Sequence, residues 1–128
     1  MQKPQIVADT NVFVSALRSQ FGASYKLLSL IDKGIFKLNL SVPLALEYEA
    51  VAKRMIGEIA LNEKEVDDIL DFVINNSNKW DIYYLWRPQL KDPGDDMVLE
   101  LAVAATCNYI LTYNVKDFKG TEKFGIEV

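Results

Sequence analysis

The stretch IVADTNVFVSAL, residues 6–17, places a single acid between two apolar segments. Residues 5–8 predict a short buried strand, and Asp9 follows that strand directly. Taken alone, Asp9 is best explained as the N-cap of a segment that starts at Val12, because aspartate often has that role. A part in a chemical site depends on which other residues gather at the end of this strand.

Strands and helices alternate along the rest of the chain. Further strands are expected at residues 36–42, 80–85 and 109–112, with a weaker one at 123–128. Helices are expected at residues 24–33, 43–56, 62–76 and 92–107. This alternation predicts an α/β fold with one parallel sheet covered by helices on both faces.

Local sequence signals support the helix boundaries. Gly34 can end the first of these helices, and Pro43 fits the first turn of the next. Asn62 and Glu65 have the spacing of a capping box, and Asp92 is placed to cap the last helix. No repeat or linker interrupts the pattern, so residues 1–128 are expected to form one domain.

Composition restricts the chemistry. The chain has 128 residues, a net charge of −4, one cysteine and no histidine. Triads that need histidine and zinc sites built from histidine or several cysteines are therefore excluded. Acid–base or metal chemistry must rest on carboxylates, lysines or tyrosines. With no export signal and no apolar run of about 20 residues, the expected location is the cytoplasm.

Acidic or amide side chains follow each of the first four predicted strands. Open parallel sheets bind ligands beyond the carboxyl ends of their strands, where these side chains would converge. The candidates, in chain order, are Asp9, Glu47, Asp92, Asp95, Asp96, Asn114 and Asp117. Asp92 is better explained as a helix cap, and Asp117 is equally well explained by a turn before Phe118.

Helical spacing ranks the acids on the two helices. Glu47 lies about 70° from the apolar stripe of its helix and borders the core, whereas Glu49, at about 130°, is a surface charge. An ion pair with Arg54 is the simplest alternative for Glu47. On the last helix the expected inward face is Leu99, Ala102, Val103 and Thr106. That face places Asp95 ahead of Asp96 as a candidate.

Several carboxylates at one edge need a cation to neutralise them. Mg²⁺ or Mn²⁺ prefers oxygen ligands, and such an ion can activate water and stabilise a phosphate transition state. Thr10 and Asn11 can hold Asp9, while Thr112 and Asn114 can orient water or the acids. These residues favour hydrolysis of phosphodiesters.

Four segments resemble the motif regions of the PIN-domain nucleases, and of their VapC-like toxin branch in particular. They are IVADTNVFVSAL, SVPLALEYEAV, DPGDDMVLELAVAA and YILTYNVKDF, which together extend from Ile6 to Phe118. The resemblance implies a three-layer α/β/α sandwich with about five parallel strands and Mg²⁺- or Mn²⁺-dependent cleavage of RNA. It also implies a homodimer, and a cognate antitoxin that places an arginine against the acids.

The resemblance assigns the acids one by one. Asp9, Glu47 and Asp95 match the first three family acids, and Asp117 matches the trailing acid of the fourth motif. The position two after the motif threonine, where the family often has aspartate, is Asn114 here. This departure leaves open whether one or two metals bind.

Two other functions remain open at this stage. In a phosphotransfer domain Asp9 would be the nucleophile, although Asn11 stands where a dehalogenase-type site has a second acid. A catalytically silent interaction module is the other alternative. Exposed side chains among Tyr83, Tyr84, Trp86 and Tyr113 can stack on RNA bases. A place in the core or in an interface is the alternative for Trp80, Tyr83 and Trp86, and it is the better explanation for most of these aromatic residues.

Overall fold

The computed structural model describes residues 3–19, 22–59, 61–80, 93–118 and 125–128, with the backbone alone at 93–96. The strands are β1 (Gln5–Ala8), β2 (Lys37–Ser41), β3 (Asn78–Trp80) and β4 (Tyr109–Leu111). The helices are α1 (Thr10–Arg18), α2 (Ala23–Ser29), α3 (Val42–Arg54), α4 (Glu63–Asn75) and α5 (Pro93–Ala104). Three short 3₁₀ turns are η1 (Ile31–Lys33), η2 (Ile56–Glu58) and η3 (Val115–Phe118).

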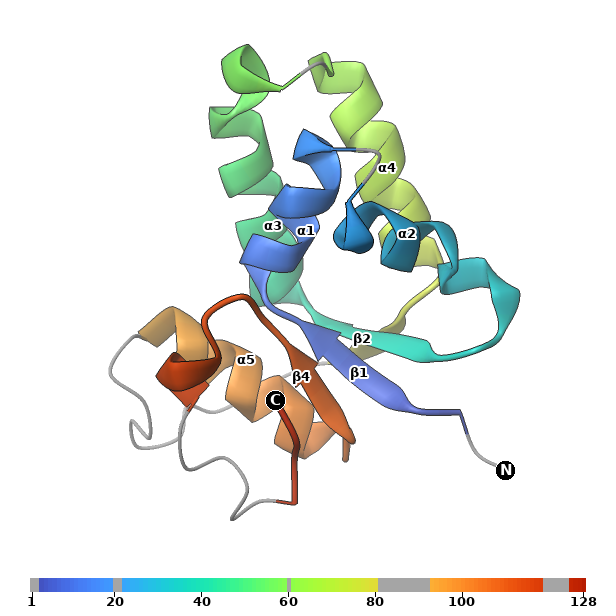
Figure 1. Ribbon diagram of the computed structural model, residues 1–128, viewed down its shortest axis with the longest axis vertical. Coiled ribbons are helices and arrows are strands. Elements are labelled where there is room, and N and C mark those ends of the chain that lie inside the picture. Colours follow the sequence, from blue (N-terminus) through green and yellow to red (C-terminus); the bar gives the residue numbers. More distant parts are fainter. Residues whose placement is uncertain (1–2, 20–21, 60, 81–92, 119–124) are drawn as a thin grey trace.

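The four strands form a parallel sheet in the order β3-β2-β1-β4. Figure 1 shows α1 to α4 above this sheet and α5 below it, which is the predicted α/β/α sandwich. Of the expected fifth strand, the described residues 125–128 form one parallel bridge, between Glu127 and Tyr109, beside β4. Its two hydrogen bonds run from Ile110 N to Glu127 O, 2.8 Å, and from Glu127 N to Asn108 O, 3.0 Å.

Apolar side chains from both layers bury the sheet. A parallel sheet that is covered on both faces needs apolar residues at successive strand positions, as in β1. The most deeply buried large side chains include Val7, Phe13, Leu38, Leu44, Tyr48, Leu99, Leu101 and Ile110. Among the helices that the structure describes, none combines the length and the apolar character needed to cross a membrane.

A buried amide network ties three strands together. Asn39 on β2 is fully buried, and its Nδ2 donates to Gln5 Oε1 on β1 at 3.1 Å. Its Oδ1 accepts from Asn78 Nδ2, 3.2 Å, and from Trp80 Nε1, 2.8 Å, both on β3. A buried amide is costly unless its donors and acceptors are satisfied, so these hydrogen bonds favour the observed register of the strands.

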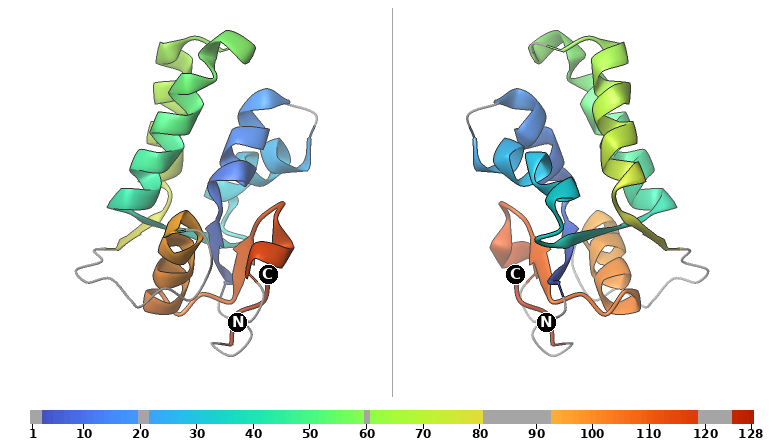
Figure 2. Two further views of the ribbon diagram at one scale, coloured as in Figure 1. Left: turned by 90° about the vertical axis from the view of Figure 1, so that its left-hand side faces the viewer. Right: turned by 90° about the vertical axis from the view of Figure 1, so that its right-hand side faces the viewer.

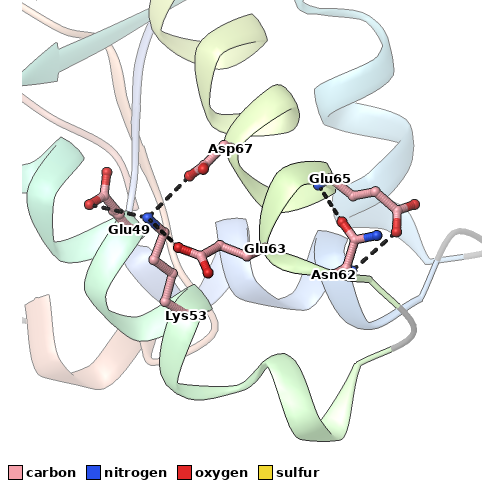
Figure 3. A network of polar contacts seen from close by, with 6 residues as sticks. All are labelled: Glu49, Lys53, Asn62, Glu63, Glu65 and Asp67. Atoms are coloured by element: carbon pink, nitrogen blue, oxygen red, sulfur yellow. Dashed lines mark hydrogen bonds and ion pairs between the residues drawn. The ribbon is translucent and has the colours of Figure 1, made fainter.

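The helix-terminal signals of the first three predicted helices occur where the sequence places them. Gly34 follows η1 with φ of 79°, and Pro43 lies in the first turn of α3. Asn62 and Glu65 form the capping box of α4: Glu65 N donates to Asn62 Oδ1, 2.8 Å, and Asn62 N donates to Glu65 Oε1, 3.1 Å. Figure 3 shows this box beside the ion pairs that join α3 to α4.

Those ion pairs centre on one lysine. Lys53 Nζ on α3 lies 3.2 Å from Asp67 and 3.6 Å from Glu63, both on α4, and 3.7 Å from Glu49 on its own helix. The hydrogen bond to Asp67, together with the three negative charges, raises the pKa of Lys53. Glu49 therefore serves the α3–α4 contact, on a different face of α3 from Glu47.

Several predicted boundaries were wrong. The expected helix 24–33 is two elements, α2 and η1. Helix α5 ends at Ala104, short of the predicted Cys107, and Thr106 adopts a left-handed φ of 50°. Thr106 is therefore exposed, while Leu101 joins the buried face of α5. Of the strand expected at 80–85, β3 includes only Trp80, and residues 81–85 lie outside the described chain.

Tyr48 connects α3 to both α1 and β1. Its ring stacks on Phe13 of α1 with centroids 4.6 Å apart and an interplanar angle of 4°. Its hydroxyl donates a hydrogen bond to the carbonyl oxygen of Ala8, the last residue of β1. Burial raises the pKa of Tyr48, and the charges of Asp9 and Glu47 raise it further, so the hydroxyl stays protonated and can donate.

We expect Tyr48→Phe to lower the free energy of unfolding by about 1–3 kcal/mol. The ring stacking survives, but the buried Ala8 carbonyl loses the donor that Tyr48 provides. Urea denaturation followed by circular dichroism measures the change. Tyr25→Phe, at an exposed position on α2, is the matched control and should change stability by less than about 0.5 kcal/mol. Equal effects at both positions would show that the Tyr48 hydroxyl is not stabilising.

Candidate functional site

The candidate site lies where the carboxyl ends of β1 and β4 meet. From β1 the chain moves outward through β2 to β3, then crosses back to place β4 on the other side of β1. Open α/β sheets bind ligands at such a reversal of strand order. The register pairs Ala8 with Leu111, and Asp9 N donates to Leu111 O at 2.8 Å. Asp9 and Thr112 therefore leave the sheet side by side.

Asp9 is both a helix cap and a member of this site. Its Oδ1 accepts a hydrogen bond from Thr10 N at 2.8 Å, which starts α1 at Thr10 rather than at the predicted Val12. Its Oδ2 accepts a hydrogen bond from the Thr112 hydroxyl, also at 2.8 Å. With 9% of its surface exposed, the carboxylate is held from two elements. The cap and the site are thus compatible explanations of one residue.

Glu47 approaches the same edge from α3. It is half-buried, as its helical position predicted, and its Oε2 accepts a hydrogen bond from the Thr10 hydroxyl. Thr10 therefore contacts both acids, Asp9 through its backbone and Glu47 through its side chain. The alternative ion pair with Arg54 does not form in the described structure, where Arg54 is exposed.

Thr112 is the centre of the hydrogen bonds around Asp9. While its hydroxyl donates to Asp9, it accepts from Asn11 Nδ2 at 3.3 Å and from Asn114 N at 3.0 Å. One hydroxyl has one proton and two acceptor positions, so these three bonds use its full capacity. Asn11 Oδ1 accepts in turn from Tyr113 N at 3.3 Å. Asn114 thus contributes its backbone N–H, whereas the sequence predicts that its side chain orients water or the acids.

The structure describes the side chain of only one of the remaining predicted acids, Asp117. Asp117 is exposed on η3, and its N–H donates to Asn114 O at 3.0 Å. No hydrogen bond or ion pair of the Asp117 carboxylate is found among the described residues. Asp95 and Asp96 belong by their backbone to the first turn of α5, and Asp92 lies outside the described residues.

Helix α5 runs antiparallel to the strands. Figures 1 and 2 show its first turn at the same edge as the starts of α1 and α3. Among the side chains that are described, no three acids or cysteines lie close enough together to bind a metal ion. Asp9 and Glu47 with the intervening Thr10 nevertheless offer carboxylate and hydroxyl oxygens, which are the donors that hard divalent cations prefer.

The two acids open into a cleft of about 580 Å³. Sequence reasoning assigned no role here to Ser15 and Arg18, which line the cleft from α1. The sequence could have predicted this position for both residues. Asn11, Ser15 and Arg18 lie on one face of a helix that starts at Thr10. The other lining residues are Val14, Val51, Met55 and Tyr113.

Comparison with known proteins agrees with this geometry. No curated protein matches the chain. A family model described as a PIN domain matches residues 5–116, from the start of β1 to η3. PIN domains are generally nucleases, and they generally use divalent metals. The match extends over most of the chain, and the chain belongs to the PIN-domain family.

Proposed function

We propose that this protein is a metal-dependent endoribonuclease that acts as the toxin of a toxin–antitoxin pair. The observation that carries the nuclease proposal is the meeting of Asp9 and Glu47 through Thr10 at the reversal of strand order. Membership of the PIN-domain family supports it. The proposal treats residues 1–128 as one PIN-like domain that works in the cytoplasm.

Asp9, Glu47, Asp95 and Asp117 would hold Mg²⁺ or Mn²⁺ in this proposal, with Asp96 as a supporting acid. When bound, such an ion lowers the pKa of water and stabilises negative charge on the phosphate. Asp117 is the least supported member, because its carboxylate is exposed and makes no described contact with the other acids. A site with Asn114 in place of the usual aspartate favours one metal over two.

The surrounding residues position the acids. Thr112 fixes one oxygen of Asp9, and Asn11 and the Asn114 N–H fix Thr112. Thr10 holds Glu47 next to the helix cap. These contacts orient the carboxylates before substrate binds, so little reorganisation remains for the reaction itself. The reaction would add water across a phosphodiester bond of RNA.

Metal binding tests the site directly. Asp9→Asn and Glu47→Gln should weaken Mn²⁺ binding by more than the roughly 10- to 100-fold that loss of an outer-shell partner costs. Glu49→Gln removes an acid from the same helix but from the Lys53 cluster, and should bind Mn²⁺ like the wild type. Isothermal titration calorimetry gives the affinities, and RNA cleavage should fall in parallel. A folded wild type that binds no divalent ion would contradict the proposal and favour a silent interaction module.

Toxicity is tested by expression. Induction of the wild type in a bacterial host should arrest growth and degrade RNA, because an unrestrained ribonuclease depletes transcripts. Asp9→Asn should permit growth, and Glu49→Gln should arrest it. Co-expression of a small protein from the neighbouring gene should restore growth if that protein is the antitoxin. Cleavage of RNA in vitro without growth arrest would support the nuclease activity and contradict the role as a toxin.

A homodimer is the oligomeric state that we propose. Val42 and Leu46 lie one turn apart on α3 and are 61% and 59% exposed, which suits burial against a second copy. Sedimentation velocity should give a particle of two chains, and Leu46→Glu should shift it to one. A single-chain particle for the wild type at micromolar concentration would contradict the dimer.

A further inference from the structure

Tyr113 is an exposed aromatic residue that makes hydrogen bonds through both its backbone N–H and its hydroxyl. It follows β4, and 59% of its surface is accessible. Its backbone N–H donates to Asn11 Oδ1 at 3.3 Å, and its hydroxyl lies 2.6 Å from Ser24 Oγ and 3.4 Å from Ser15 Oγ. Hydrogen bonds from Ser15 and Ser24 lower the pKa of the phenol. An exposed ring normally samples several rotamers, whereas this one is held by α1 and α2.

The ring lies on the wall of the cleft that contains the candidate acids. The cleft of about 580 Å³ is lined by Tyr113 together with Asp9 and Glu47. This volume falls within the range of roughly 300–1,000 Å³ that is usual for small-molecule sites. A group that stacked on Tyr113 would therefore lie within the same cleft as the carboxylates.

Arg18 is the one basic side chain among the described residues that line this cleft. Its Nη2 lies 3.9 Å from both Glu58 Oε2 and Met55 Sδ. The Arg18–Glu58 pair is exposed on both sides, and exposed pairs of this length contribute little stability. The guanidinium can therefore exchange Glu58 for a phosphate, to which arginine offers a two-pronged contact.

We infer that Tyr113 stacks on a base of the RNA strand and that Arg18 contacts a phosphate of the same strand, next to the bond that is cut. An aromatic platform with a nearby cation is the usual arrangement for binding an unpaired nucleotide. The inference rests on the proposed nuclease function and adds the substrate contacts to it. The hydroxyl contacts with Ser15 and Ser24 keep the ring in place before the base arrives, which reduces the entropy lost on binding.

Binding of a fluorescein-labelled phosphorothioate oligoribonucleotide, which resists hydrolysis, tests the platform in the presence of Mn²⁺. Tyr113→Leu should raise the Kd by about tenfold, whereas Tyr113→Phe retains the ring and loses only the hydroxyl contacts with Ser15 and Ser24, so it should raise the Kd by about threefold. Tyr25→Leu, an exposed tyrosine on α2 outside the cleft, is the matched control and should bind normally. Circular dichroism verifies that each variant is folded.

Salt dependence tests the phosphate contact. Arg18→Gln should reduce the slope of log Kd against log salt concentration by about 0.7, the value for one phosphate of a single strand. Arg54→Gln, an exposed arginine that does not line the cleft, is the control and should leave the slope unchanged. An unchanged slope for Arg18→Gln would overturn this half of the inference.

The outcomes separate the inference from the proposed function. If the wild type neither binds nor cuts RNA, both the proposed nuclease function and the stacking on Tyr113 are contradicted. If the wild type does both and Tyr113→Leu binds RNA equally well, only the stacking on Tyr113 is contradicted. If Tyr113→Phe bound RNA as weakly as Tyr113→Leu, the hydroxyl contacts and not the ring would matter for binding, and the stacking inference would be overturned. Normal RNA binding with weakened binding of a protein inhibitor would assign the surface to that protein and also overturn it.

Discussion

The site depends on one constraint, which is that a buried carboxylate at the end of a strand needs hydrogen-bond donors. Asp9 receives them from Thr10 at the start of α1 and from Thr112 at the end of β4. Thr10 is the next residue along the chain, whereas Thr112 reaches Asp9 only because β1 pairs with β4 in parallel. The order of the strands, the start of the first helix and the orientation of the first acid are therefore parts of one arrangement. Thr10 then extends it to Glu47.

Fold and site also share α3. Glu47 and Tyr48 are neighbours in sequence, yet one points into the cleft and the other into the core. The Tyr48 hydroxyl contacts the residue that precedes Asp9, so the helix that carries the second acid is fixed to the strand that carries the first. Lys53 secures the far end of the same helix to α4. One helix therefore carries residues for the cleft, the core and the contact with α4.

The parts that sequence reasoning predicted well depend on local physics. Gly34, Pro43 and the Asn62–Glu65 box work through contacts within a few residues, and all appear where expected. The α/β alternation and the position of Glu47 at the border of the core follow from periodicity, which is also local. The start of α1 and the end of α5 were predicted less well. Asp9 caps a helix that begins at the next residue, Thr10, and Thr106 adopts a left-handed conformation after α5 has ended. The sequence predicted that Thr112 could orient the acids. Its contact with Asp9 and that of Tyr113 with Asn11 join residues about 100 positions apart, and spacing along the chain does not reveal such partners.

The amide network around Asn39 has a consequence for the distance between the two acids. Strand β2 ends at Ser41, whose side chain caps α3, and Glu47 follows from that helix. A slip of one residue between β1 and β2 would move the start of α3 by about 3.3 Å relative to Asp9, which exceeds the tolerance of a hydrogen bond. Asn39 and Gln5 oppose that slip from inside the sheet. The hydrogen bond between Asn39 and Gln5 thus helps to set the distance between the carboxylates of Asp9 and Glu47.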